Sequence, residues 1–177
     1  MLRNYIDQSS YSAEFIYLGQ KDDDVKLLID KINKHDVRNR LNVYIWERIF
    51  FTENSGKQLL KALHNRRIHE FKITKYLNRQ EAKVVINFLN SPDVTYAKYD
   101  IRFEDTDDVI GALKAIENKF SFICGQIVTE EPVSKEAEEL ALAILQTHYD
   151  CTLYLNSEVK ALKHWKKRGL EKIYMWF

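Results

Sequence analysis

The sequence feature that most constrains the fold is a spacing of 28 residues between apolar positions. Stepping 28 residues at a time from Phe15 reaches only apolar or aromatic residues, and the same step from Ile32 gives a second apolar series. The first series is Phe15, Val43, Phe71, Tyr99, Ile127 and Leu155. The second is Ile32, Leu60, Phe88, Ile116 and Ile144. A fixed period of roughly 20 to 50 residues is typical of proteins built from stacked repeats.

The unit that repeats is clearest in residues 68–93. Phe71 and Ile73 alternate with polar residues, and this period of two places apolar side chains on one face of a strand. Residues 82–89 place apolar side chains at helical spacing. Asn78 with Glu81 three residues later predicts a capping box, and Pro92 predicts the end of the helix. The unit is therefore a strand followed by an amphipathic helix.

The same pattern divides the rest of the chain into further units within a single domain, residues 1–177. Strands are expected at 13–19, 41–51, 95–103, 120–128, 151–155 and 172–177. Helices are expected to follow Asp22–Asp24, a cap at Asn54-Ser55, a cap at Asp105-Thr106 and a cap at Ser134. About six strand–helix units then fill residues 13–165. Residues 1–12 form an N-terminal cap or arm, and residues 166–177 form a C-terminal strand cap.

The 28-residue strand–helix repeat resembles the ribonuclease-inhibitor type of leucine-rich repeat. Residues 71–89 and 125–145 are the segments most similar to the family pattern, although Tyr76 stands where the family usually places Asn or Cys. The resemblance covers roughly residues 13–165. It implies an α/β fold, a short right-handed solenoid with about seven parallel strands on the concave face and helices on the convex face.

In such a solenoid, the polar residues between the apolar strand positions face the concave side. The residues expected there are Tyr44, Trp46, Arg48, Glu70, Lys72, Lys98, Asp100, Arg102, Tyr154, Tyr174 and Trp176. Aromatic residues and arginine dominate the energetics of protein–protein interfaces. The sequence therefore predicts a non-enzymatic module that binds a protein partner through this face. The alternative at this point is a mixed charged face that is only solvated.

Composition narrows the classes of partner. The chain has 27 Lys and Arg against 26 Asp and Glu, and this balance argues against general nucleic-acid binding, which needs a net basic face. Two cysteines are too few for a disulfide framework, so a reducing, cytoplasmic location is expected. No apolar stretch approaches the length of a membrane span, so no membrane partner is expected.

The competing interpretation is a compact α/β enzyme or a nucleotide- or phosphate-binding domain. A doubly wound sheet also alternates strands and helices, but it needs a Gly-rich first turn, and the chain has only five Gly. Residues 54–57 lack the upstream Gly and the following Ser or Thr of a phosphate loop. Cys124, Cys151 and His148 lack a fourth zinc ligand. Asp22–Asp24 and Asp107-Asp108 suit first helical turns. No catalytic residue, metal or cofactor is therefore predicted.

Two segments near the C-terminus, residues 160–168 and 172–177, add further expectations. Residues 172–177 are an aromatic edge strand, which predicts pairing with a partner or self-association with a second copy. The basic segment 160–168 is expected to be a solvated helix face, with an acidic partner or nucleic acid as the alternative. Small divergent proteins of this kind occur among bacterial effectors and immunity proteins, an association by fold alone.

Overall fold

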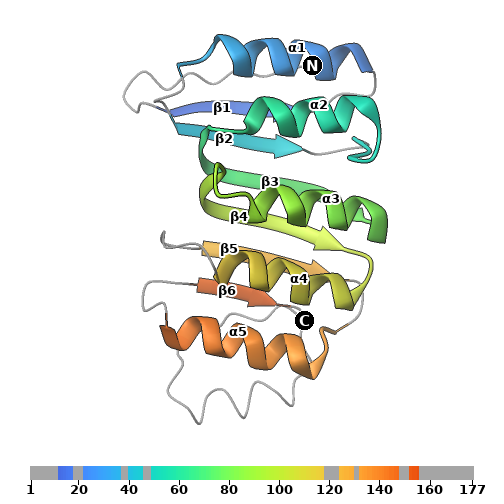
Figure 1. Ribbon diagram of the computed structural model, residues 1–177, viewed down its shortest axis with the longest axis vertical. Helices are drawn as coiled ribbons and strands as arrows, with labels where there is room; N and C mark the ends of the chain where they lie inside the picture. Colours follow the sequence, from blue (N-terminus) through green and yellow to red (C-terminus); the bar gives the residue numbers. More distant parts are fainter. Residues whose placement is uncertain are drawn as a thin grey trace.

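The computed structural model describes residues 12–17, 22–36, 40–45, 49–117, 124–129, 132–147 and 152–155. These residues form six strands and five helices that alternate along the chain (Figure 1). The strands are β1 (Ser12–Tyr17), β2 (Arg40–Ile45), β3 (Arg67–Leu77), β4 (Thr95–Phe103), β5 (Cys124–Thr129) and β6 (Thr152–Leu155). The helices are α1 (Asp22–Lys34), α2 (Asn54–Leu63), α3 (Arg79–Asn90), α4 (Thr106–Glu117) and α5 (Lys135–Thr147).

The strands form one open, parallel sheet whose spatial order is the chain order, β1-β2-β3-β4-β5-β6. The helices lie on the same side of this sheet, the near side in Figure 1. Helices α1 and α2 are in contact, as are α3 and α4, and α4 and α5. The protein is therefore an α/β structure of two layers, in which each new strand–helix unit is added beside the previous one.

The core lies between the two layers, and burial along β2 follows the predicted period of two. In β2, Leu41, Val43 and Ile45 are fully buried, whereas Asn42 and Tyr44 between them are partly exposed. Because successive side chains of a strand point to opposite faces, the buried set faces the helices and the other set faces away from them. We call the second side of the sheet the open face.

The 28-residue spacing is confirmed as a sheet register across the first four strands. Phe15 pairs with Val43, Val43 with Phe71, and Phe71 with Tyr99. The register then changes, because Tyr99 pairs with Gly125 and Ile101 pairs with Ile127, a spacing of 26 residues. A shift of two residues keeps every side chain on its own face. The apolar series therefore continues through Ile127, although its neighbour in β4 is not the one expected.

The change of register begins at an irregularity in β3. Lys72 pairs with Asp100 and Tyr76 pairs with Arg102, so four steps along β3 match two steps along β4. The two extra residues form a bulge, and bulges re-aim side chains locally. As a result, Tyr76 lies level with Arg102, and the neighbouring Lys75 forms an ion pair with Glu81 of α3. β3 is also longer than the strand expected from the sequence, since it spans 11 residues.

The predicted helix caps are confirmed at three helices and wrong at one. The Asn78 side chain accepts hydrogen bonds from the Gln80 and Glu81 amides at 3.0 and 3.1 Å, and Glu81 completes the capping box. Asp105 and Ser134 accept equivalent bonds at the starts of α4 and α5. At α2, however, the cap position is Glu53, which makes no side-chain cap bond, and Asn54 is already helical. Asn54 instead accepts a bond from Gln58 one turn later.

Two further expectations need correction or fall outside the structure. The strand expected over residues 41–51 ends at Ile45, and residues 49–53 form a loop and turn whose Ile49 and Phe51 are buried. An apolar run predicts burial but does not distinguish a strand from a loop that packs on the core. The expected seventh strand, residues 172–177, lies outside the described residues, as do residues 1–11 of the expected N-terminal cap, residues 1–12. Ser12, the last residue of that expected cap, is the first residue of β1.

Candidate binding face

The candidate site is the part of the open face formed by β2, β3 and β4. In-register pairing places Asn42, Glu70 and Lys98 in one row across these strands, and Tyr44, Lys72 and Asp100 in the next row. The bulge in β3 adds Tyr76 and Arg102 as a third row. We call this set the open-face patch: Asn42, Tyr44, Glu70, Lys72, Tyr76, Lys98, Asp100 and Arg102. Six of these eight residues are among the binding residues predicted from the sequence, and strand alternation also places Asn42 on this face.

Glu70 is the centre of one half of the patch. The Tyr44 hydroxyl donates a hydrogen bond to Glu70 Oε2 at 2.6 Å, and Lys98 Nζ lies 2.9 Å from Glu70 Oε1. Burial alone raises the pKa of Glu70, but these two bonds and the charges of Lys98 and Lys72 outweigh it and lower the pKa below 4.5. Glu70 is therefore ionised at neutral pH, and it holds Tyr44 and Lys98 in fixed positions.

Asp100 is the centre of the other half, and the structure corrects its expected exposure. Its Oδ2 lies 2.8 Å from Lys72 Nζ, directly across the two strands, and the residue is only 6% exposed. Its other oxygen, Oδ1, is buried and has no hydrogen-bond partner among the described residues. Strand alternation predicted the correct face but did not predict that neighbouring side chains cover this short carboxylate. Lys72 is therefore the more exposed member of this pair.

Arg102 differs from the two lysines because no carboxylate neutralises it within the described residues. Its guanidinium carbon lies 5.9 Å from the centre of the Tyr76 ring, a distance at which a cation and an aromatic face attract. Its Nε atom is buried without a hydrogen-bond partner in this part of the chain. Arginine is planar and offers several donors to a carboxylate. Arg102 is therefore available to an acidic group from outside.

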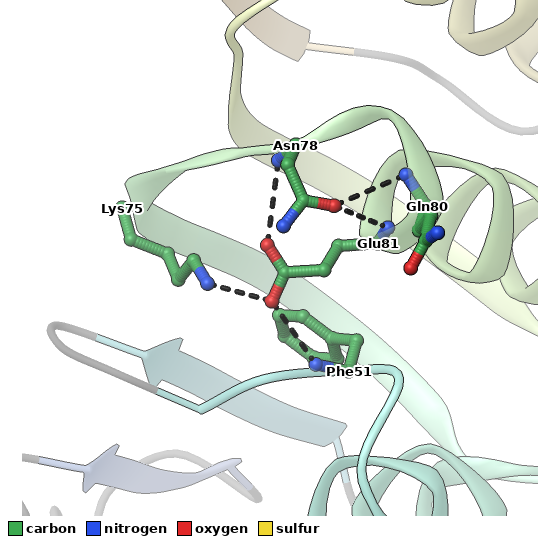
Figure 2. Close-up of polar contacts among 5 residues, drawn as sticks. All are labelled: Phe51, Lys75, Asn78, Gln80 and Glu81. Carbon is green, nitrogen blue, oxygen red and sulfur yellow. Dashed lines mark hydrogen bonds and ion pairs between the residues drawn. The ribbon is translucent and has the colours of Figure 1, made fainter.

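A second cluster lies beyond the patch, where β3 leads into α3. Glu81 is 1% exposed, and its carboxylate meets Lys75 Nζ at 2.6 Å, the Phe51 amide at 3.3 Å and the Asn78 amide at 3.3 Å (Figure 2). Lys75 Nζ also lies 4.3 Å from the centre of the Phe50 ring. A buried charge is tolerated only when it is paired and hydrogen-bonded, as it is here. This cluster ties the loop after β2 to α3 and is structural.

The remaining predicted binding residues divide into two groups. Tyr154 lies in β6, and its backbone pairs with Gln126 of β5. Gln126 in turn pairs with Asp100 of β4. Trp46, Arg48, Tyr174 and Trp176 lie outside the described residues. The patch of charged and aromatic side chains therefore includes Tyr44, Glu70, Lys72, Lys98, Asp100 and Arg102 of the predicted set. For all eleven predicted residues, a binding role stays a prediction.

Sequence reasoning missed three residues of the open face. Tyr76 was treated as a repeat position that departs from the family pattern, because the bulge that turns it toward Arg102 has no clear sequence signature. Arg40 and Arg67 pair with each other at the starts of β2 and β3, and both are exposed. The strands had been expected to begin later. The alternation of β2 extended back by one residue would have found Arg40.

One other candidate site found in the sequence, residues 54–57, has a structural explanation. A Cβ atom on Gly56 would lie 2.4 Å from the Phe50 carbonyl oxygen, so a glycine is needed where α2 crosses the loop after β2. His64 packs edge-on against Phe88, with ring centres 5.5 Å apart. Within the described residues, no group of three or more His, Cys, Asp or Glu side chains is placed to hold a metal ion. None of the described helices is long and apolar enough to cross a membrane.

Comparison with known proteins adds no family to this description. No protein-family model matches the chain, and no curated protein matches it with significance. The resemblance to leucine-rich repeats therefore remains a prediction, and the case for function depends on the geometry of the open face.

Proposed function

We propose that this protein is a non-enzymatic binding module that recognises a protein partner through the open face of its sheet. The observation that supports this most strongly is the open-face patch itself. Its side chains are held by cross-strand bonds such as Tyr44–Glu70 and Lys72–Asp100. Side chains fixed in advance lose little conformational entropy when a partner binds. The patch therefore has the rigidity and the aromatic and charged composition that protein interfaces use.

The fold proposal is a short right-handed solenoid of the leucine-rich-repeat-like kind, with the open face as its concave side. Two features support it: the strands follow the chain order, and the helices lie on one side of the sheet. A right-handed strand–helix–strand connection is the general rule for parallel sheets. Repeat proteins of this architecture bind partners on an extended sheet surface.

The alternative of an α/β enzyme has less support. Ligands in doubly wound sheets bind at the crevice where the strand order reverses, and the order of the six described strands does not reverse. The glycine of the 54–57 segment is explained by its contact with Phe50 and Phe51. The geometry therefore favours recognition over catalysis.

The test is a comparison of two double variants as baits in an extract of the cells that make the protein. Tyr76→Ala with Arg102→Ala alters the open face, and Lys57→Ala with Lys61→Ala removes two exposed charges from α2. Truncating a residue that contributes strongly to an interface costs more than about 1 kcal/mol of binding free energy. We expect the open-face bait to lose a specific partner by roughly tenfold or more, as measured by quantitative mass spectrometry.

The α2 variant is the matched control, and it should retain the partner at the wild-type level. Thermal unfolding of both baits must be measured first, so that loss of binding is not loss of fold. Equal loss of the partner from both folded baits would contradict the proposal, as would full retention by the open-face bait.

A further inference from the structure

We infer that the partner recognised by the open face presents an acidic protein segment to it. This inference rests on the proposed function and adds the chemistry of the partner. Its basis is the balance of charge among the described side chains of the open face. The positive residues are Arg40, Arg67, Lys72, Lys98 and Arg102, and the negative residues are Glu70 and Asp100. These seven side chains together carry a net charge of +3, whereas the whole chain has a net charge of only +1.

The two carboxylates are already satisfied inside the patch. Glu70 is paired with Lys98 at 2.9 Å, and Asp100 is paired with Lys72 at 2.8 Å. The three arginines, in contrast, form no ion pair within the described part of the chain. Arg40 and Arg67 pair in register on neighbouring strands, and like charges in such positions repel each other. A carboxylate placed between them relieves that repulsion, and its bonds to arginine are among the stronger kinds of hydrogen bond.

The positions of the arginines also define the size of the partner segment. Arg67 is level with Thr95 of β4, and Arg102 lies seven residues further along the same strand. At about 3.3 Å per residue, the Arg40–Arg67 pair and Arg102 are separated by roughly 23 Å along the strands. A single carboxylate does not reach both ends of this distance. The partner must therefore present acidic groups along an extended or helical segment.

The environment of Arg102 indicates the kind of contact at the second end. The guanidinium lies 5.9 Å from the Tyr76 ring centre, and this contact holds it over the face of the sheet. An aromatic ring beside an arginine orients the guanidinium while leaving its edge for a carboxylate. The site fits a Glu or Asp side chain more closely than a mobile counterion.

The test uses defined probes in place of the unknown partner. A fluorescent dodecaglutamate peptide can span the roughly 23 Å distance, because an extended chain covers about 3.3 Å per residue, whereas a tetraglutamate peptide covers only about 13 Å. We expect measurable binding of the dodecaglutamate by fluorescence anisotropy in about 50 mM salt, and clearly weaker binding of the tetraglutamate. Binding should weaken further in about 300 mM salt, because exposed charges are screened.

Three variants, two of which remove equal charge, locate the binding. Arg40→Gln with Arg67→Gln should weaken dodecaglutamate binding by roughly tenfold, and Arg102→Gln should weaken it by about three- to fivefold. Lys57→Gln with Lys61→Gln on α2 removes as much charge as the first pair and should change binding by less than about twofold. Far-ultraviolet circular dichroism and the thermal midpoint confirm that each variant is folded.

Several outcomes would overturn the inference. These are no binding of dodecaglutamate, equal weakening by the α2 control, or tighter binding of a 12-base-pair DNA duplex than of the peptide. The last result would identify a phosphate backbone as the ligand chemistry. A neutral or basic partner that is lost specifically from the Tyr76→Ala, Arg102→Ala bait would overturn this inference while leaving the proposed function intact. Capture of equal amounts of partner by the open-face bait and the α2 bait would contradict the proposed function.

Discussion

At the scale of single residues, Glu70 shows how the open face keeps its charges in place. Its carboxylate lies between Tyr44 on one neighbouring strand and Lys98 on the other. Burial opposes the charged form, but the bonds from both neighbours favour it more strongly, so the pKa falls below its ordinary value. The same residue that organises the candidate interface therefore also makes the stability of the fold depend on pH.

The predicted pH dependence follows from the sign of this shift. Because the folded-state pKa of Glu70 is depressed, its contribution to stability is present above the ordinary pKa of glutamate and is lost as the pH falls through the folded pKa. Glu70→Gln removes this contribution. We therefore expect the free energy of unfolding to decline less steeply in the variant than in the wild type between about pH 6 and about pH 3. Urea denaturation at each pH measures the difference.

Asp108 provides a control with the opposite sign. Burial, and then the charge of Asp105, raise the pKa of Asp108, so its contribution to stability is present at low pH and is lost as the pH rises through the folded pKa. Asp108→Asn should therefore make the decline on acidification steeper. If the free energy of unfolding falls equally steeply with pH in the wild type and in Glu70→Gln, the bonds to Tyr44 and Lys98 do not stabilise the folded state.

At the scale of elements, the contact between α2 and the loop after β2 determines where the second unit turns. Gly56 lies in the first turn of α2, and the backbone of Phe50 and Phe51 occupies the space that a side chain would need. A backbone neighbour cannot move aside as the end of a flexible side chain can. This close approach seats buried Phe51 so that its amide meets Glu81.

We predict that Gly56→Ala lowers the free energy of unfolding by about 1–3 kcal/mol, the range for inserting a carbon into a packed site. Gly111→Ala is the matched control, because it lies in α4 and its nearest neighbour is the Ile86 Cδ1 atom at 3.3 Å. Alanine gains up to about 1 kcal/mol over glycine inside a helix, so this variant should be neutral or more stable. Urea denaturation of the two variants is the measurement, and equal effects would contradict the packing argument.

The elements also show what the sequence alone could and could not provide. The alternation of Phe71 and Ile73 and the 28-residue spacing predicted the strands, their faces and their parallel neighbours, because these depend on local periodicity. The bulge between Lys72 and Tyr76 was not predictable, since nothing in its composition marks it. The burial of Asp100 was also not predictable, because it depends on the length of side chains from neighbouring strands. Phe50 and Phe51 were expected in a strand but lie in a loop, because an apolar run does not distinguish a strand from a loop that packs on the core.

At the scale of the whole molecule, the sequential strand order produces two unlike faces. The helices cover one face and bury its aliphatic residues, whereas the other face bears the cross-strand pairs Tyr44–Glu70, Glu70–Lys98 and Lys72–Asp100. A face with ordered polar side chains and three arginines without ion pairs in the described residues is suited to recognition. We therefore propose that a protein partner binds this face and not the helices.

Site-specific photo-crosslinking to the captured partner tests which face of the protein the partner contacts. A benzoylphenylalanine residue is placed on the open face at position 67 or 98, or on the outer side of the helices at position 57 or 83; the wild-type residues at all four positions are exposed. The yield of crosslinked partner is measured by quantitative mass spectrometry. We predict crosslinks from positions 67 and 98 and only background yield from positions 57 and 83. Equal yields from the two sides, or a higher yield from the helices, would contradict the account.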